Sequence, residues 1–251
     1  MFDLCGRLAL VTGSGRGIGF SLARGLHAAG AGVVLNGLNS EALRIAAAGL
    51  GGENAGVHWR DFDVTVPEKV ASAVDEIESS VAPIEILVNN VGTQFRAPLE
   101  DFPLDRWKQL IDTNLTSAFL VGQAVGRRMI KRGHGKIINV LSIASELGRR
   151  GIAPYAATKG GLKMLTRSMC AEWARYGVQA NGIGPGYFVT RLTQTLKDDP
   201  AFDAWVRARV PAGRWGEVDE LMGAAVFLAS PASDYVNGQT IYVDGGMLAV
   251  V

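Results

Sequence analysis

Tyr155 and Lys159 are the two residues whose types and spacing most clearly suggest chemistry. They lie four positions apart in the stretch from Pro154 to Tyr176, whose apolar spacing predicts a helix. Residues at this spacing share one face of a helix, so the ammonium of Lys159 is expected beside the phenol of Tyr155. The pair predicts a centre at which a proton is donated or accepted.

The phenol of Tyr155 must become more acidic before it can exchange a proton near neutrality. A free phenol has a pKa of about 10, and the required fall is roughly three units, or about 4 kcal/mol. A neighbouring ammonium lowers a phenol pKa by charge attraction. Pro154 suits the first position of a helix, which would put Tyr155 in the first turn, where the helix dipole also favours a phenolate. We therefore expect a lowered pKa for Tyr155.

Ser142 is a third candidate, because it directly follows the apolar run from Ile137 to Leu141. A strand that ends there would bring the Ser142 hydroxyl next to Tyr155, where it can hydrogen-bond a substrate oxygen. Ser145 is the nearest alternative on the same stretch.

The elements that must position these residues alternate along the chain. Runs rich in Val, Ile and Leu predict strands buried on both faces, and the stretches between them predict helices. This alternation forces parallel strands joined by right-handed crossovers. We predict an α/β fold with one domain over residues 1–251. It is a Rossmann-type doubly wound parallel sheet with helices on both faces and its ligand site at the carboxyl ends of the strands. The seven predicted strands are Leu8 to Val11, Val33 to Leu35, Val57 to Phe62, Ile84 to Val88, Ile137 to Leu141, Val178 to Ile183 and Thr240 to Val243.

The predicted helices are Gly17 to Ala29, Ser40 to Ala48, Pro67 to Ser80, Leu104 to Arg132, Pro154 to Tyr176 and Glu217 to Ala229. The segment 187–214 has no strand pattern and carries two prolines. We interpret it as a helical insertion over the carboxyl edge of the sheet, and our hypothesis is that it forms a substrate lid.

A glycine-rich turn follows the first predicted strand and precedes the first predicted helix. Glycine lets the backbone turn tightly and approach a pyrophosphate, and the helix N-terminus offers N–H donors. A P-loop is excluded, because no Lys-Ser or Lys-Thr pair follows. The turn therefore predicts a dinucleotide site, and it reads Thr12-Gly13-Ser14-Gly15-Arg16-Gly17-Ile18-Gly19.

The composition narrows the choice of partner. The net charge is +1 without a run of Lys or Arg, which gives no reason to expect nucleic acid or an anionic membrane. Two cysteines, Cys5 and Cys170, and three isolated histidines suggest neither a disulfide nor a metal site. No signal peptide and no bilayer-spanning segment is recognisable. We expect a cytoplasmic protein that acts on a small molecule.

The spacing of Gly13, Gly17 and Gly19 resembles that of the short-chain dehydrogenase/reductase family, and the resemblance extends over nearly the whole chain. The run 89–92, Asn-Asn-Val-Gly, is similar to the family's Asn-Asn-Ala-Gly motif. The resemblance implies an enzyme that transfers a hydride between the nicotinamide of NAD(P) and a secondary alcohol or ketone. It also implies four catalytic residues: Ser142, Tyr155 as acid/base, Lys159, which also holds the nicotinamide ribose, and Asn114, which positions a water for proton relay.

The same resemblance implies the contacts of the cofactor. Asp63 and Val64 would contact the adenine, the Pro185-Gly186 turn would face the nicotinamide, and the residues after that turn would contact its carboxamide and phosphate. The full predicted set is Gly13, Ser14, Arg16, Gly17, Ile18, Gly19, Asn36, Asp63, Val64, Asn90, Gly92, Tyr155, Lys159, Pro185, Gly186, Val189 and Thr190.

The choice between NADP and NAD depends on the end of the second predicted strand. NAD sites carry an acid there that binds the ribose hydroxyl, and Gly37 stands at that position. Arg16 is available to pair with a 2′-phosphate. These residues favour NADP(H). Leu38 departs from the arginine that many NADP-using relatives carry, so NAD(H) stays open.

Arg96, in the loop after the fourth predicted strand, can bind a carboxylate bidentately, or it can be a solvated loop cation. The runs 89–101 and 211–216 resemble the gluconate 5-dehydrogenase group of the family, which interconverts D-gluconate and 5-ketogluconate. A polyhydroxy acid or its ketone is therefore the expected substrate. Its candidate contacts are Gln94, Arg96, Ser142, Arg149, Arg150 and Tyr155.

Two other functions stay open. A 3-oxoacyl-carrier-protein reductase shares the same scaffold, and the basic cluster between Arg127 and Arg132 would suit an acidic carrier. A dinucleotide-binding sensor without turnover is the alternative from another class. The family resemblance also implies a homotetramer that forms through the long helices and the C-terminal segment.

Overall fold

The computed structural model of the chain describes all 251 residues. Seven strands form one sheet in the order β3-β2-β1-β4-β5-β6-β7, and each neighbouring pair is parallel. The order reverses between β1 and β4, where the two halves of a doubly wound sheet meet. The predicted fold class is confirmed. The strands are β1 Leu8–Val11, β2 Gly32–Gly37, β3 Val57–Asp61, β4 Ile84–Asn89, β5 Gly135–Val140, β6 Val178–Pro185 and β7 Thr240–Val243.

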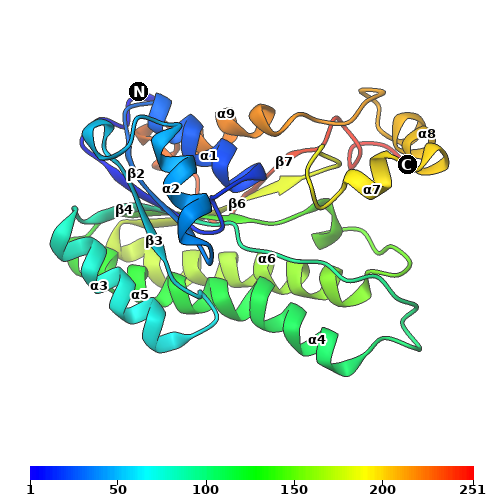
Figure 1. The fold of residues 1–251 in the computed structure, drawn as a ribbon, viewed down its shortest axis with the longest axis horizontal. Helices are drawn as coiled ribbons and strands as arrows, with labels where there is room; N and C mark the ends of the chain where they lie inside the picture. The colour runs from blue at the N-terminus through cyan, green and yellow to red at the C-terminus, as the bar shows by residue number, and fades with distance from the viewer.

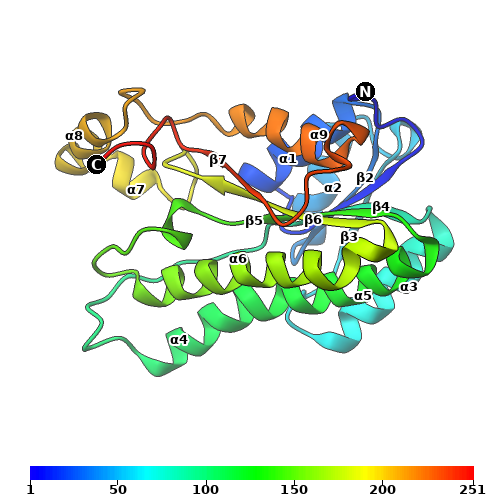
Figure 2. The same cartoon turned by 180° about the vertical axis from the view of Figure 1, so that it is seen from behind.

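Helices cover both faces of the sheet (Figure 1). Helices α1, α2 and α9 pack on one face, and α3, α5 and α6 pack on the other, as the reverse view in Figure 2 also shows. Each face has its own apolar core, because β-branched and leucine side chains project from both sides of the central strands. The helices are α1 Gly17–Ala28, α2 Ser40–Ala48, α3 Pro67–Ser80, α4 Leu104–Ile111, α5 Ser117–Arg132, α6 Ala153–Trp173, α7 Gln194–Lys197, α8 Pro200–Arg209 and α9 Met222–Ala229.

The predicted helix from Leu104 to Arg132 is interrupted. A π-helical turn, Asp112–Thr116, joins α4 to α5. Such turns are rare and often occur at functional sites, because they redirect a side chain out of the regular helical register. The predicted start of α9 is also different, since a 3-10 turn, Val218–Leu221, precedes it.

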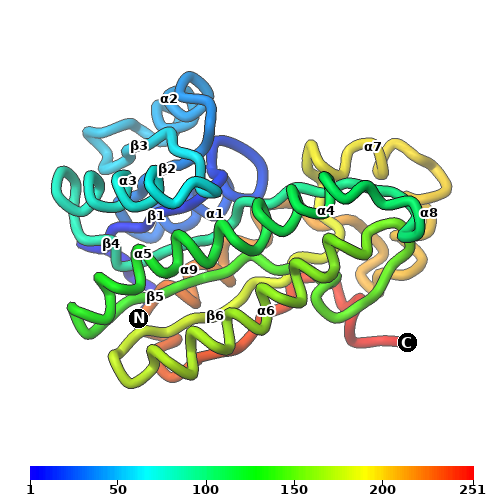
Figure 3. The backbone as a smooth tube through the Cα atoms, turned by 90° about the horizontal axis from the view of Figure 1, so that it is seen from below, coloured from blue at the N-terminus to red at the C-terminus, as the bar shows by residue number.

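The segment 187–214 contains α7 and α8 and has only one isolated bridge, between Phe188 and Gly216. Figure 3 shows α7 and α8 at the end of the molecule where α6 begins. A small apolar cluster anchors the segment to the loop after β5 and to the C-terminal residues, through Val206, Trp215 and Met247 among others. The segment thus carries one short helix and one of about three turns. None of the helices in the chain has the length and apolar character needed to cross a lipid bilayer.

Candidate active site

Tyr155 and Lys159 lie at the start of α6. The helix begins at Ala153 with a proline in its first turn, so Tyr155 also lies in that turn. Lys159 is 3% exposed, and its Nζ donates a hydrogen bond of 2.8 Å to the carbonyl oxygen of Val140. The same Nζ lies 5.8 Å from the centre of the Tyr155 ring. The two side chains therefore share one face of α6, above the carboxyl end of β5.

The direction predicted for the Tyr155 pKa is wrong in this structure. Burial raises the pKa of the Tyr155 phenol, while a hydrogen-bonding contribution from Ser142 and the charge of Arg96 act against the rise. Burial lowers the pKa of Lys159 to about 8. The ammonium of Lys159 faces a carbonyl rather than the phenolic oxygen, so the cation that favours the phenolate is Arg96.

Ser142 ends the strand region and begins a 3-10 turn, Ile143–Ser145. Its Oγ accepts a hydrogen bond of 3.1 Å from the backbone N–H of Ala144 and keeps its own proton available to donate. The hydroxyl of Ser145 donates to the carbonyl oxygen of Ser142. Of the two candidate serines, Ser142 is the one whose hydrogen bonding lowers the pKa of Tyr155, and Ser145 holds the turn.

Glu146 is a supporting residue that the sequence reasoning missed. Its carboxylate accepts a hydrogen bond from the Tyr242 hydroxyl of β7 and pairs with Lys163 of α6. The ring of Tyr242 lies against Gly184 of β6, where an added Cβ would approach the ring to 2.3 Å. Burial raises the pKa of Tyr242 to about 12. Glu146 thus ties the Ser142 turn to the helix that carries Tyr155. Gly184, a glycine within a buried strand, was the available sequence signal.

Asn114 lies in the π-helical turn and is fully buried. Its Nδ2 donates to the Thr93 carbonyl at 2.9 Å, and its Oδ1 accepts from the Thr93 N–H at 2.7 Å. An added Cβ at Gly92 would lie 3.5 Å from the Lys159 Nζ and 3.6 Å from the Asn114 Oδ1. Asn114 and Lys159 therefore border the same space, as expected of a relay pair.

The glycine-rich turn joins β1 to α1, and its geometry requires glycine. Gly13 and Gly17 have φ of +63° and +60°, and a Cβ at Gly19 would lie 2.4 Å from the Gly13 carbonyl oxygen. Asn90 braces the turn, since its Nδ2 donates to the carbonyls of Thr12 and Gly13 at 3.0 and 3.1 Å. No side chain caps α1, and its first turn carries no acid. The N–H groups there suit an anion such as a pyrophosphate.

Other predicted cofactor residues lie around this turn, and some of them also hold its loops together. Ser14 and Asn36 are buried and hold the loops together: Ser14 donates to the Val11 carbonyl at 2.6 Å, and Asn36 donates to the Phe62 carbonyl at 3.0 Å. Asp63 closes its own turn by accepting from Thr65, which lowers its pKa. Arg16 is exposed at the start of α1, Ile18 is half-buried and Val64 is buried.

The turn after β6 brings a second segment to the same edge of the sheet. An added Cβ at Gly186, next to Pro185, would lie 2.7 Å from the Cα of Asp244, so only glycine fits. Val189 donates its N–H to the Gly216 carbonyl at 3.0 Å, and the Thr190 hydroxyl lies 3.0 Å from that of Thr193.

The substrate candidates separate into two groups. Arg96 donates to the Gln94 side chain at 3.2 Å, and Arg149 donates to the Tyr187 hydroxyl at 2.9 Å. Burial and the charge of Arg149 lower the pKa of Arg96. Neither arginine has a carboxylate within 4.0 Å. Arg96 and Arg150 are both exposed, but Arg96 contacts Gln94 and its charge acts on Tyr155, whereas Arg150 makes no hydrogen bond and has no contact with this group.

The chain is similar to known proteins over its whole length. A family model described as "Enoyl-(Acyl carrier protein) reductase" matches residues 13–248. The chain is 53% identical to a gluconate 5-dehydrogenase of Gluconobacter oxydans, over 98% of this chain and 96% of the relative. It is 50% identical to a 5-keto-D-gluconate 5-reductase of Escherichia coli, over 100% and 99%. A solved structure of a gluconate 5-dehydrogenase from Burkholderia cenocepacia, in complex with NADP and tartrate, has a TM-score of 0.97 and 57% identity, over 100% of this chain and 98% of that chain.

Proposed function

The chain belongs to the short-chain dehydrogenase/reductase family, and we propose that it interconverts D-gluconate and 5-ketogluconate with NADP(H) as the preferred cofactor. The observation that carries this proposal is the pair Arg96 and Arg149, two guanidinium groups without a carboxylate partner on the side of Tyr155. Arg149 is half-buried and Arg96 is exposed, and cations that lack a carboxylate partner favour an anionic ligand. The names of the Gluconobacter and Escherichia coli relatives describe the same conversion.

The residues present fit a dinucleotide. The turn from Gly13 to Gly19 and the uncapped N-terminus of α1 would hold the pyrophosphate. Arg16 would pair with the 2′-phosphate, and Lys159 would hold the nicotinamide ribose. Gly37 ends β2 without the acid that repels a 2′-phosphate. The NADP-bound relative supports the preference for NADP(H).

The bound nicotinamide supplies the hydride for reduction and takes it up in oxidation. Tyr155 gives its phenolic proton to the carbonyl oxygen of the ketone during reduction and takes it back during oxidation. Ser142 donates a hydrogen bond to the same oxygen, and Arg96 stabilises the phenolate that Tyr155 becomes. Lys159 and Asn114 return the proton through the space that Gly92 leaves open.

The carboxylate of the acid is assigned to Arg96, with Gln94 and Arg149 as its neighbours. The tartrate in the Burkholderia relative is itself a hydroxy acid, which supports a carboxylate contact at such a site. Segment 187–214 would cover this ligand as a lid, since its Tyr187 hydroxyl already contacts Arg149.

The test is an absorbance assay of NADPH oxidation with 5-ketogluconate, run beside an acetoacetyl thioester. We expect a kcat/KM for the acid about 100-fold or more above that for the thioester, because the thioester leaves the arginine pair uncompensated. Faster reduction of the thioester would favour the 3-oxoacyl-carrier-protein reductase function. Calorimetric binding of NADPH without turnover of sugar acids or acyl ketones would favour the sensor, against which the complete catalytic set argues.

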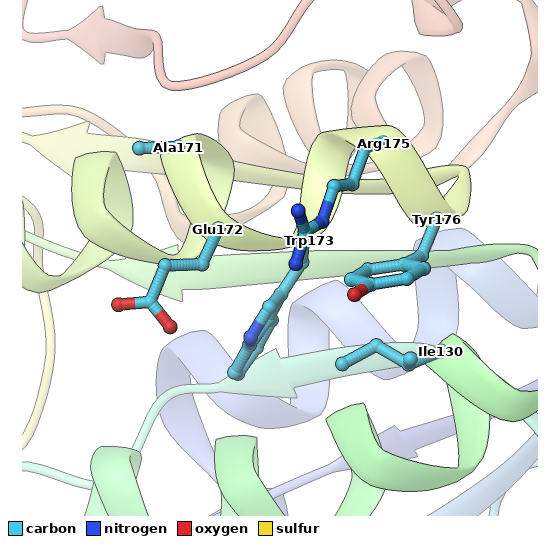
Figure 4. Close-up of a pocket in the computed structure, with 6 residues that line it drawn as sticks. All are labelled: Ile130, Ala171, Glu172, Trp173, Arg175 and Tyr176. Atoms are coloured by element: carbon cyan, nitrogen blue, oxygen red, sulfur yellow. The ribbon is translucent and has the colours of Figure 1, made fainter.

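We also propose a homotetramer in the cytoplasm. Figure 4 shows Trp173, Arg175 and Tyr176 beside Ile130 in a groove of about 470 Å³ between α5 and α6, at the end of α6 far from Tyr155. The exposed Phe119 of α5 lines an adjoining groove that shares Ile130 and Trp173 with this one. Light scattering after size exclusion tests the assembly, and a monomer would refute it.

The cytoplasmic location is supported by two free cysteines and by the nicotinamide cofactor.

A further inference from the structure

Arg149 is enclosed by aromatic side chains in a way that proton transfer and carboxylate binding do not explain. Its guanidinium carbon lies 4.4 Å from the ring centre of Phe202, 5.6 Å from that of Trp205 and 5.9 Å from that of Tyr187. Its Nη1 also donates to the Tyr187 hydroxyl at 2.9 Å. All three rings belong to segment 187–214, whereas Arg149 belongs to the loop before α6. Arg149 therefore links the proposed lid to the helix that carries Tyr155.

The aromatic cluster is already packed on its own side. Tyr187 meets the rings of Phe202, Trp205 and Trp215 edge-on at 5.5 to 5.8 Å. Asp203 fixes Trp215 by accepting from its Nε1 at 2.7 Å. The cluster thus forms a packed aromatic face on the lid, and a planar guanidinium can stack on such a face and donate at the same time.

The link brings two like charges together. Burial and, after it, the positive charge of Arg149 lower the pKa of Arg96. Burial raises the pKa of Tyr155, and the charge of Arg96 acts against that rise. A closed lid with no anion inside carries this repulsion, and a carboxylate placed at the two guanidinium groups removes it. Closure of the lid is therefore more favourable when the bound substrate is an acid than when it is a neutral ketone.

We propose that Arg149 is a positioning residue that holds the lid closed over Tyr155, and that its proximity to Arg96 makes closure depend on an anionic substrate. The selectivity part rests on the proposed function, whereas the link between Arg149 and the lid does not. Arg149 acts through Phe202, Trp205 and Tyr187, which exclude water from the reacting carbonyl when the lid is closed. The repulsion between the arginines discriminates against neutral polyol ketones.

The experiment compares Arg149→Leu, Arg149→Lys and the control Arg150→Leu, which removes the same charge from the exposed neighbour. We expect Arg149→Leu to raise the KM for 5-ketogluconate about 10- to 100-fold and to leave the Kd of NADPH within about twofold. Arg149→Lys keeps the charge but not the planar stack, so it should recover part of the loss. For a neutral polyol ketone the loss should be smaller, because the variant also removes the repulsion. Arg150→Leu should match the wild type within about twofold.

A second readout follows the lid directly. Trp205 is exposed and Trp215 is buried, and both lie in the lid cluster. Wild type should change its tryptophan fluorescence when 5-ketogluconate is added to the enzyme with NADP⁺, a pair that cannot react, and Arg149→Leu should lose most of that change. Hydrogen exchange of the α8 amides in the enzyme alone should be about 10-fold faster in Arg149→Leu at an unchanged melting temperature.

The outcomes separate the two proposals. If wild type reduces 5-ketogluconate and Arg149→Leu keeps its KM, its fluorescence change and its slow exchange in α8, the role of Arg149 is wrong while the function stands. If wild type shows no turnover of the acid, the proposed function is wrong, and the exchange of α8 alone then decides whether Arg149 holds the segment.

Discussion

Lys159 donates a hydrogen bond from its ammonium to the carbonyl oxygen of Val140 at 2.8 Å. The side chain is almost completely buried, and burial lowers its pKa from 10.5 to about 8. The Val140 carbonyl thus holds the lysine side chain over the end of β5. On the cofactor side of the site, Lys159 can therefore lose its proton near physiological pH.

The buried ammonium predicts a pH dependence of stability. Between pH 8 and 10.5 the unfolded chain binds more protons at this residue than the folded chain, so this residue makes stability rise with pH across that window. Below pH 8, where the buried ammonium is charged, it lowers the free energy of unfolding by on the order of 3 kcal/mol. From pH 7 to 10.5 the difference in unfolding free energy between wild type and Lys159→Met should shift in favour of wild type by that amount. Urea unfolding at both pH values measures it, and a constant difference contradicts the assigned pKa.

Arg96 is expected to control both binding and the pH profile. Arg96→Met removes the partner of the substrate carboxylate, so the KM for D-gluconate should rise about 100-fold. It also removes the charge that favours the Tyr155 phenolate, so the pKa of Tyr155 rises and the profile of gluconate oxidation moves to higher pH. Steady-state kinetics across pH test this, with the exposed Arg106→Met as the control. If the pH profile of gluconate oxidation is unchanged in Arg96→Met, the electrostatic role of Arg96 is wrong.

Gly37 is expected to control the cofactor choice. An added Cβ at Gly37 meets only Leu43 side-chain atoms at 3.5 to 3.9 Å, so a larger residue fits. Gly37→Asp should lower the ratio of kcat/KM for NADPH over NADH about 100-fold, because the carboxylate repels the 2′-phosphate and accepts from the ribose hydroxyl. Gly37→Asn has the same shape without the charge and should change the ratio much less. Equal effects of the two variants would point to sterics instead.

Glu146 is expected to act on catalysis through Ser142. Glu146→Gln weakens the tie between the Ser142 turn and α6, and we expect kcat to fall about three- to tenfold with little change in NADPH binding. In a Ser142→Ala background the same change should have almost no effect, since the group it positions is gone. The double-mutant cycle is the measurement, and additive losses would show that Glu146 acts elsewhere.

The fold was predictable because its signals are local. The buried runs of β1, β2, β4, β5 and β6 stand out in the sequence, and the turn from Gly13 to Gly19 sits between a strand and a helix. Of the proposed catalytic residues, Ser142, Tyr155 and Lys159 were recognisable for the same reason, because Ser142 follows a strand and the other two lie at helical spacing. Asn114, in the π-helical turn, came from the family resemblance alone. Family resemblance supplied the roles.

The supporting contacts were not predictable, because their partners come from distant segments. Glu146 meets β7 and α6, and Arg149 meets α8 and the turn after β6. The pKa of Tyr155 was mispredicted for a related reason. Helical spacing puts Lys159 on the correct face, but only the position of the Val140 carbonyl decides where its ammonium points.

The central claim is that Tyr155 exchanges the proton of the reacting oxygen, and Tyr155→Phe tests it most directly. The variant keeps the ring and loses only the hydroxyl. Measured as NADPH oxidation with 5-ketogluconate, kcat should fall about 1,000-fold, while the Kd of NADPH measured by calorimetry stays within about twofold. Turnover near the wild-type rate would contradict the account.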